Sequence, residues 1–239
     1  MKITTVLFDL DGTLLPMDMN EFIKAYFGGI ARHLAPYGYE PQKLIDSIWQ
    51  GTAAMVKNNG EETNETRFWQ GFEAAYGKPA KEDEELFATF YREKFDKVQS
   101  SCGYTPAARQ IIDTVRACGL RTALATNPIF PAMATERRIA WAGLSTSDFE
   151  LYTTYENSRF CKPNLDYYRD IMQTLGVLPE ECLMVGNDVG EDMIAEQLGA
   201  RVFLLTDCLI NSKGADISVY PHGSYDDLIA FIKNLNKDD

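Results

Sequence analysis

The feature that most constrains this fold is the alternation of short apolar segments with amphipathic helical segments over residues 104–239. Residues 122–125, 182–185 and 201–205 are apolar and partly β-branched, and each has the length of a buried strand. Between them, apolar residues recur every three or four positions, the spacing of a helix that buries one face. Strands that alternate with helices predict a parallel sheet with helices on both faces.

The same pattern includes the beginning and the end of the chain. Residues 3–8 are a predicted buried strand that ends at Asp9, and residues 149–152 are predicted to form a further short strand. Capping residues and apolar spacing predict helices that begin at Thr105-Pro106, Asn164, Glu191 and Ser224. These helices lie between or after predicted strands, as a sheet covered on both faces requires.

Residues 17–99 interrupt the alternation, because helical spacing replaces strand-like segments there. Apolar side chains recur along four stretches, which contain Phe22, Tyr26 and Ile30; Leu44, Ile48 and Met55; Phe68, Phe72 and Tyr76; and Phe87, Tyr91 and Val98. We therefore predict an α/β core with a parallel sheet and an inserted, all-helical cap domain. The core is discontinuous, residues 1–16 and 104–239, and the cap comprises residues 17–103.

Polar residues that could take part in catalysis or binding follow the predicted strands or open the loops beside them. They are Asp9 and Asp11, Thr126 and Asn127, Lys162, and the group Asn187, Asp188 and Asp192. Ligands of parallel α/β sheets bind at the carboxyl ends of the strands. The sequence therefore predicts one site at that edge of the sheet, made by four loops that are far apart in the chain.

Several carboxylates that converge on one site repel each other, and a hard divalent cation such as Mg²⁺ removes this repulsion. Asp9 and Asp188 are the expected side-chain ligands, and Asp11 is expected to contribute its backbone carbonyl. Asp192, four residues beyond Asp188, is expected to support the ligands, as is Asn187. Asn187 could instead be a ligand itself; we favour Asp188 because its spacing from Asp192 fits.

Residues 6–14, Val-Leu-Phe-Asp-Leu-Asp-Gly-Thr-Leu, resemble the first motif (DxDGT) of the haloacid dehalogenase-like (HAD) hydrolase superfamily. The other motifs of that family occur in the expected order, as Ala125-Thr126-Asn127, Lys162-Pro163 and the acidic segment 186–192. The resemblance covers essentially the whole predicted core and implies its Rossmann-like HAD fold. The helical insertion after the first motif corresponds to the position of the C1 cap in this family.

The resemblance implies a role for each matched residue. Asp9 would be the nucleophile that forms an aspartyl-phosphate, and Asp11 would protonate the leaving oxygen and then deprotonate the hydrolytic water. Thr126, Asn127 and Lys162 would bind the phosphoryl group. Mg²⁺ would bridge Asp9, the phosphate and Asp188.

Asp11 also separates branches of the family. Dehalogenases and phosphonatase-like members resemble this pattern without an aspartate at that position, whereas phosphatases and phosphomutases have it. The sequence therefore predicts an enzyme of the phosphatase-type branch, a Mg²⁺-dependent phosphohydrolase of a small phosphorylated metabolite. The alternatives are a phosphomutase and a non-catalytic phosphometabolite-binding protein, the latter because of Asn187; dehalogenation is disfavoured.

Composition limits the classes of binding partner and the cellular compartment that we expect for this protein. The chain has 239 residues with 35 Asp and Glu against 23 Lys and Arg, a formal net charge of −12 that opposes general nucleic-acid binding. We expect no membrane association, because no apolar stretch reaches about 18 residues. The five cysteines fit neither a zinc site nor a disulfide scaffold, and the N-terminal segment does not resemble a signal peptide. We expect a cytoplasmic protein.

One set of aromatic residues in the predicted cap admits two interpretations. Its members could line a substrate pocket or form the interior of the cap, and we favour the interior: Tyr26, Phe27, Trp49, Phe68 and Trp69. Cys161, His33 and His222 are interpreted as residues without a chemical role.

Overall fold

Five short parallel strands form the central sheet of the computed structural model, which describes residues 1–237. The strands are β1 (Thr5–Phe8), β2 (Arg121–Leu124), β3 (Cys182–Gly186), β4 (Arg201–Leu205) and β5 (His222–Gly223), and their order is β2-β1-β3-β4-β5. In the register, Phe8 pairs with Leu124 on one side and with Val185 on the other. The predicted parallel sheet is therefore confirmed, and the carboxyl ends of β2, β1 and β3 lie at one edge.

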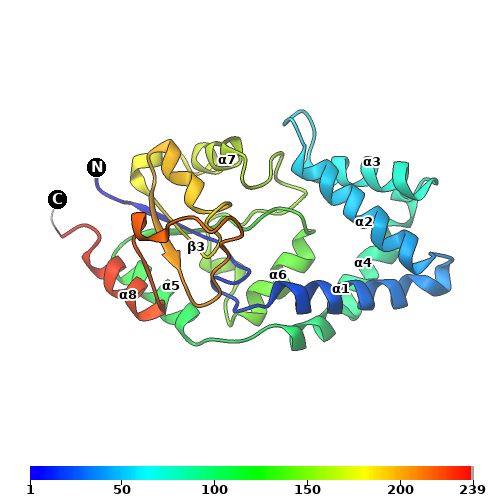
Figure 1. The fold of residues 1–239 in the computed structure, drawn as a ribbon, viewed down its shortest axis with the longest axis horizontal. Helices are drawn as coiled ribbons and strands as arrows, with labels where there is room; N and C mark the ends of the chain where they lie inside the picture. The colour runs from blue at the N-terminus through cyan, green and yellow to red at the C-terminus, as the bar shows by residue number, and fades with distance from the viewer. Residues whose placement is uncertain (238–239) are drawn as a thin grey trace.

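Helices cover both faces of the sheet (Figure 1). Val6 and Phe8 face one hydrophobic cluster, which includes side chains of α5 (Ala107–Ala117) and α8 (Tyr225–Asn234). Leu7 faces a second cluster, formed with α7 (Leu165–Leu175) and the 3₁₀ helix η6 (Met193–Leu198). Because both faces of β1 are buried, its sequence is apolar at successive positions instead of alternating.

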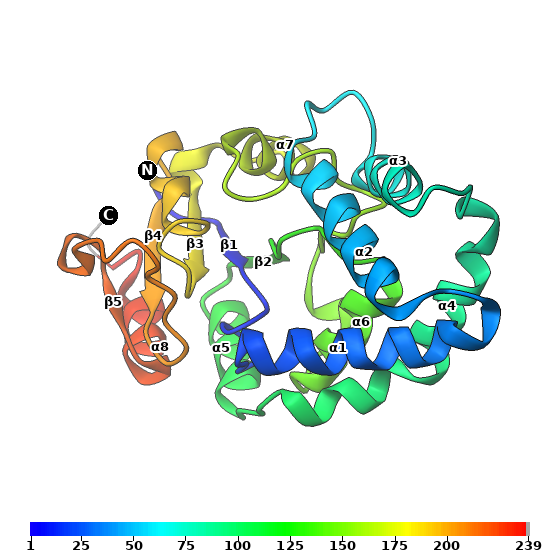
Figure 2. The same cartoon turned by 45° about the vertical axis from the view of Figure 1, so that its right-hand side comes forward.

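The segment between β1 and α5 is helical, as predicted, and lies to one side of the sheet (Figure 2). It contains α1 (Met19–Leu34), α2 (Pro41–Val56), α3 (Asn64–Tyr76), α4 (Glu84–Glu93) and the 3₁₀ segment η3 (Phe95–Ser101). Asp18 and Thr63 cap α1 and α3 through their side chains, and Gly77 ends α3 with a φ of 80° that favours glycine. The apolar residues predicted to face inward along these helices are buried, except Phe68, which is partly buried.

The chain crosses between the sheet and the helical segment at two neighbouring points. Met17 and Cys102 form an antiparallel bridge, and the Gly103 N–H donates to the Pro16 carbonyl over 2.7 Å. The boundaries predicted for the cap, 16/17 and 103/104, lie at this double crossing. The division into two domains stays a prediction.

The helical segment is joined to the core by packing and by hydrogen bonds. Phe22 and Phe95 belong to the same hydrophobic cluster as Val6, so apolar contact is continuous from the sheet into the cap. At the opposite end of the cap, the buried Asn64 side chain donates to the Pro128 carbonyl over 3.2 Å. The apolar contacts thus hold the cap helices against the core, and the hydrogen bond holds them against the loop that follows β2.

Some predicted elements differ from the observed ones. Residues 149–152 form only an isolated bridge beside β2, at Tyr152, and the helix predicted from Glu191 begins at Met193 as a 3₁₀ helix. The second change arises because residues 188–192 form a turn closed by a 2.9 Å bond from the Asp192 N–H to the Asp188 carbonyl. The sequence interpretation also missed β5 and the helix α6 (Ala132–Trp141).

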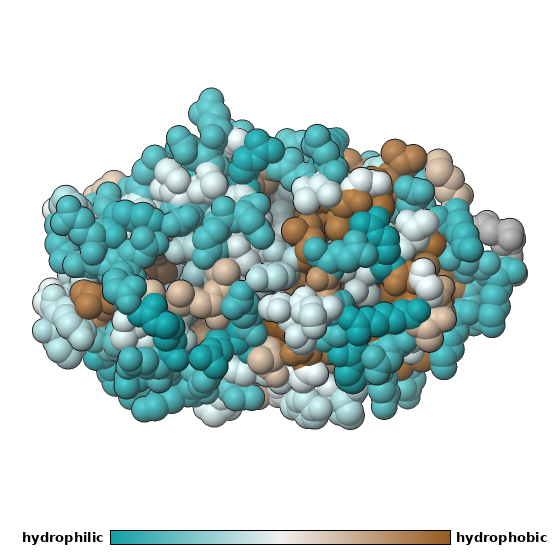
Figure 3. All heavy atoms as spheres, turned by 180° about the vertical axis from the view of Figure 1, so that it is seen from behind, coloured by the Kyte–Doolittle hydropathy of each residue, from teal (hydrophilic) through white to brown (hydrophobic). Residues whose placement is uncertain are grey.

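The surface is mostly hydrophilic, in keeping with the excess of acidic residues. Figure 3 shows the face opposite to Figure 1, with hydrophobic side chains gathered mainly on the half that carries the sheet. In residues 1–237 no helix combines the length and the apolar character needed to cross a bilayer.

Candidate active site

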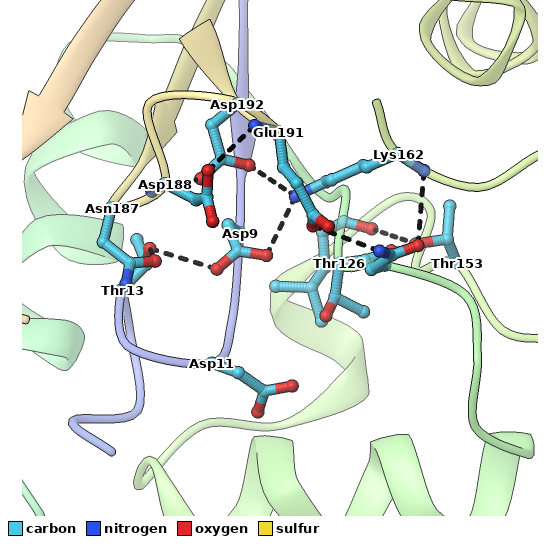
Figure 4. Close-up of polar contacts among 12 residues, drawn as sticks. Asp9, Asp11, Thr13, Thr126, Thr153, Lys162, Asn187, Asp188, Glu191 and Asp192 are labelled. Carbon is cyan, nitrogen blue, oxygen red and sulfur yellow. Dashed lines mark hydrogen bonds and ion pairs between the residues drawn. The ribbon is translucent and has the colours of Figure 1, made fainter. Parts of the chain in front are cut away.

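Asp9 lies directly after β1, and two loops fix its carboxylate. Its backbone N–H donates to the Val185 carbonyl over 2.9 Å, which continues the strand pairing for one more residue. Lys162 Nζ donates to Asp9 Oδ1 over 2.9 Å (Figure 4). Asp9 is largely buried but retains 7% exposure, so one side of the carboxylate can be approached.

Lys162 binds a second carboxylate deeper in the site. Its Nζ lies 2.6 Å from Asp192 Oδ1, and both side chains are only 1% exposed. Burial opposes the charge of Lys162, but the carboxylates of Asp192 and Asp9 outweigh it and hold the Lys162 pKa well above its ordinary value. Asp192 Oδ2 accepts the Asp188 N–H over 2.9 Å, so Asp192 orients both the lysine and the loop after β3.

Thr13 connects Asp9 to the loop after β3. Its hydroxyl lies 3.1 Å from Asp9 Oδ2 and 3.0 Å from Asn187 Oδ1. The amide nitrogen of Asn187 donates to the Cys208 carbonyl over 2.7 Å, which directs the oxygen of the amide toward Thr13. This approach requires glycine at position 12, where φ is 85° and an added Cβ would lie 2.3 Å from Asn187 Nδ2.

Asp188 forms a turn with the residues that follow it. Its Oδ1 accepts the N–H groups of Gly190 and Glu191 over 2.7 and 3.0 Å. Asp188 and Asn187 therefore reach the site from adjacent positions, and of the two side chains Asn187 is the one that shares a hydrogen-bond partner with Asp9.

Asp11 lies apart from this cluster, with its side chain directed away from Asp9 (Figure 4). Its Oδ2 pairs with the guanidinium of Arg138, a residue of α6 that is 1% exposed. Its Oδ1 is buried and has no hydrogen-bond partner in residues 1–237. Burial, reinforced by the negative charge of Asp9, raises the pKa of Asp11, although Arg138 opposes this shift.

The loop after β2 supplies Thr126 and Asn127. The Thr126 carbonyl accepts the hydroxyls of Thr153 and Tyr167 over 2.6 and 2.8 Å, which fixes the backbone beside Asp9. Asn127 donates to Glu191 Oε2 over 3.1 Å and accepts the Lys162 N–H over 3.3 Å. Both polar atoms of the Asn127 side chain thus connect the loop after β2 to the residues around Lys162 and Glu191. Burial raises the pKa of Glu191 to about 7.

The structure thus brings Asp9, Thr126, Lys162, Asn187 and the acidic turn to one edge of the sheet. The family model of haloacid dehalogenase-like hydrolases matches residues 3–199, which include every one of these loops. The chain is a haloacid dehalogenase-like hydrolase.

Relatives of this hydrolase share its length and its fold. The chain is 22% identical over 200 residues to the pyrophosphatase PpaX of Bacillus velezensis, which covers 84% of this chain and 82% of the relative. The L-2-haloacid dehalogenase of Xanthobacter autotrophicus has a TM-score of 0.59 at 16% identity, covering 98% of this chain and 99% of the other.

A third relative was solved with ligands. The Bacteroides thetaiotaomicron HAD family enzyme in complex with magnesium and inorganic phosphate has a TM-score of 0.54 at 17% identity and covers 91% of this chain and 98% of its own. Because structural neighbours include both a dehalogenase and a phosphate complex, the fold alone does not define the reaction.

The oxygen atoms near Asp9 suit a hard cation. Asp9 Oδ2 and Asn187 Oδ1 both face the single hydroxyl proton of Thr13, and each oxygen has two lone pairs, so both keep at least one lone pair free. Within residues 1–237, no three Asp, Glu, His or Cys side chains form a ready cluster for a metal ion. Mg²⁺ does not require such a cluster, because one or two carboxylates together with water and substrate phosphate commonly bind it.

Three residues of this hydrolase site were missed from the sequence. Thr13 belongs to the first motif and Glu191 to the acidic segment, so both could have been included by their position in the motifs. Arg138 had no such signal, because it follows another arginine on a helix that the sequence interpretation did not recognise. Only the tertiary fold brings it to Asp11.

Proposed function

We propose that this hydrolase is a Mg²⁺-dependent phosphatase of a small phosphorylated metabolite and that Asp9 is its nucleophile. The observation that carries this proposal is the separate environment of two carboxylates at one strand end. Asp9 is bonded to Lys162, whereas Asp11 is paired with Arg138 and keeps one buried oxygen without a partner. Dehalogenation needs no leaving-group acid, so the second carboxylate favours a phosphate ester.

In the first half of the reaction, an oxygen of Asp9 attacks phosphorus while the bond from phosphorus to the ester oxygen breaks. Asp11 gives its proton to that departing oxygen, so the product leaves as an alcohol. The raised pKa of Asp11 favours the protonated form that this step needs. Arg138 keeps the other oxygen of Asp11 in place during the transfer.

In the second half, a water molecule attacks the phosphorus of the aspartyl-phosphate. Asp11, now deprotonated, accepts a proton from this water. The bond between phosphorus and Asp9 breaks, which releases inorganic phosphate and restores the Asp9 carboxylate. The water oxygen ends in the phosphate, and Asp11 is again protonated for the next turnover.

Lys162 and the loop after β2 bind the phosphoryl group in this proposal. The Lys162 ammonium, held by Asp192, offsets the charge between Asp9 and the phosphoryl oxygens. Thr126 would contribute its hydroxyl. Asn127 would contribute its backbone N–H, because both polar atoms of its side chain are engaged by Lys162 and Glu191.

Mg²⁺ would be held by Asp9, by the backbone carbonyl of Asp11 and by Asp188, with Asn187 and Asp192 supporting these groups. When bound, the ion supplies positive charge that screens the nucleophile from the phosphate anion. The relative from Bacteroides thetaiotaomicron, solved with magnesium and inorganic phosphate, supports this part of the proposal. The pyrophosphatase relative supports hydrolysis at phosphorus.

The proposal is tested by phosphate release from p-nitrophenyl phosphate and from a panel of phosphorylated metabolites. Release is expected with Mg²⁺, and it should be lost with EDTA and restored by added Mg²⁺. Asp9→Asn should abolish release. Asp46→Asn serves as its matched control, because Asp46 lies exposed on α2 and the change likewise replaces an aspartate by asparagine. Failure to release phosphate from any compound, by folded protein with Mg²⁺, would reject the proposal.

A further inference from the structure

A small cavity of about 100 Å³ lies between the cap helices and the loop after β2. Its walls come from α1 to α4 and from residues 129–131, which follow Thr126-Asn127 directly. The central wall residues are Phe22, Tyr26, Phe27, Ile48, Trp69 and Phe130. All five aromatic residues that we interpreted as cap interior line this cavity, and Trp49 is 45% exposed: Tyr26, Phe27, Trp49, Phe68 and Trp69.

The walls of this cavity carry no charge. None of its 16 lining residues is Lys, Arg, His, Asp or Glu. The hydroxyls of Tyr26 and Tyr91 bond each other over 2.8 Å, and Thr52 Oγ1 donates to the Ile48 carbonyl over 2.9 Å. Burial raises the pKa of Tyr26 to about 12, as expected where an ion would lose its hydration. An ionised group placed here would meet no charged side chain in the wall.

Phe130 connects the cavity to the reacting groups. Its ring centre lies 5.3 Å from that of Tyr26 on the cavity side and 4.5 Å from Cζ of Arg138. Arg138 in turn pairs with Asp11, the group expected at the leaving oxygen. The cavity therefore lies on the Asp11 side of the site, where the organic part of an ester has to extend.

We propose that this cavity takes the organic part of the substrate, and that this part is a small uncharged hydrocarbon group. This inference rests on the proposed phosphatase function. The volume is somewhat below the ~150 Å³ of a cavity known to hold benzene, so the group is no larger than one six-membered ring. A carboxylate or a second phosphate would be buried there without a cation, so phosphoglycolate-like acids and pyrophosphate are poor substrates.

The test compares two primary alkyl esters with leaving groups of similar reactivity, isopentyl phosphate and 4-phosphooxybutanoate, together with pyrophosphate. We expect kcat/KM for isopentyl phosphate to exceed that for each charged compound by at least about tenfold, a discrimination that apolar pockets commonly reach. Equal rates, or a preference for a charged compound, would overturn the inference and leave the phosphatase proposal standing.

Two variants place a cation on the same helix, one inside the wall and one outside it. Thr52→Lys adds the charge to the cavity, whereas Gln50→Lys adds it to an exposed position of α2 that does not line the cavity. Thr52→Lys should lower kcat/KM for isopentyl phosphate by at least about tenfold, and Gln50→Lys should not. Equal effects of the two variants would contradict the inference.

Binding without turnover separates this inference from the proposed reaction, and it needs no variant to fold. Isothermal titration of the unmodified protein with Mg²⁺ compares isopentylphosphonate with 4-phosphonobutanoate, neither of which can be hydrolysed as an ester. Tighter binding of the hydrocarbon compound supports the cavity assignment even if no ester is cleaved. Tighter or equal binding of the carboxylate compound overturns it.

Discussion

The two regions that meet at Asp11 differ in almost every physical property. At the edge of the sheet, Lys162 joins two carboxylates, and most polar atoms there have a partner at a defined distance. The cavity between the cap helices and residues 129–131 is instead lined by aromatic and aliphatic residues, and no charged side chain lines it. In our proposals, a few polar residues at strand ends carry out the chemistry, whereas packed surfaces from distant segments select the organic group that is bound.

The largest expected effect comes from the nucleophile at the polar edge. Asp9→Asn should reduce turnover of p-nitrophenyl phosphate by about 10⁴-fold or more, because an amide oxygen does not form the acyl phosphate. Circular dichroism should show an unchanged fold, since Lys162 keeps its bond to Asp192. Substantial turnover by a clean preparation of this variant would remove Asp9 from its proposed role.

Asp11→Asn should separate substrates by their leaving groups. An alkyl phosphate needs protonation of its departing oxygen, so its kcat should fall by about 10²- to 10⁴-fold. The first step with p-nitrophenyl phosphate should be much less affected, because p-nitrophenolate departs without a proton. Equal losses of that first step for both esters would contradict general acid catalysis by Asp11.

Arg138→Met tests the junction between the two regions. Because Arg138 acts through Asp11, we expect a smaller loss in the rate of the first step with an alkyl phosphate, about 10- to 100-fold, and little change in that step with p-nitrophenyl phosphate. Arg137→Met is the matched control, since Arg137 is the neighbouring arginine and pairs with Asp96 at the surface. Equal losses of the first step for both substrates would indicate a structural role for Arg138 and no effect through Asp11.

Tyr167→Phe should have the smallest effect. It removes the hydroxyl that donates to the Thr126 carbonyl over 2.8 Å, and the free energy of unfolding should fall by about 1 kcal/mol. For a chain of this size, that corresponds to a melting temperature lower by about 2–4 °C. A loss of turnover as large as that of Asp11→Asn, at an unchanged melting temperature, would instead assign the hydroxyl to the reaction.

The core could be predicted from the sequence because its signals are local. Residues 3–8 and 201–205 are apolar segments of strand length. Ser224 marks the start of the last helix, where it forms a capping box with Asp227. The 149–152 segment was overpredicted, because apolar composition does not reveal how far a neighbouring strand pairs with it. The two-residue β5 lacks enough sequence for any pattern.

The polar edge of the sheet could be predicted from the sequence, whereas the cavity could not. Asp9, Lys162 and Asp192 stand at strand ends or in motifs, so their meeting could be inferred from parallel topology. The pairing of Arg138 with Asp11 spans 127 positions and depends on the exact orientation of a helix. Aromatic spacing along α1 likewise predicted burial of Tyr26, but not that residues 129–131 would complete a cavity beside it.

The central claim is that hydrolysis passes through a phosphoryl group on Asp9. The most direct test is rapid mixing of Asp11→Asn with p-nitrophenyl phosphate and Mg²⁺, since loss of the base should slow the second half more than the first. The account predicts a burst of one p-nitrophenol per active site and, after acid quenching, a phosphoryl group on the peptide that contains Asp9. No burst and no modified peptide, while the unmodified protein turns over the same ester, would contradict it.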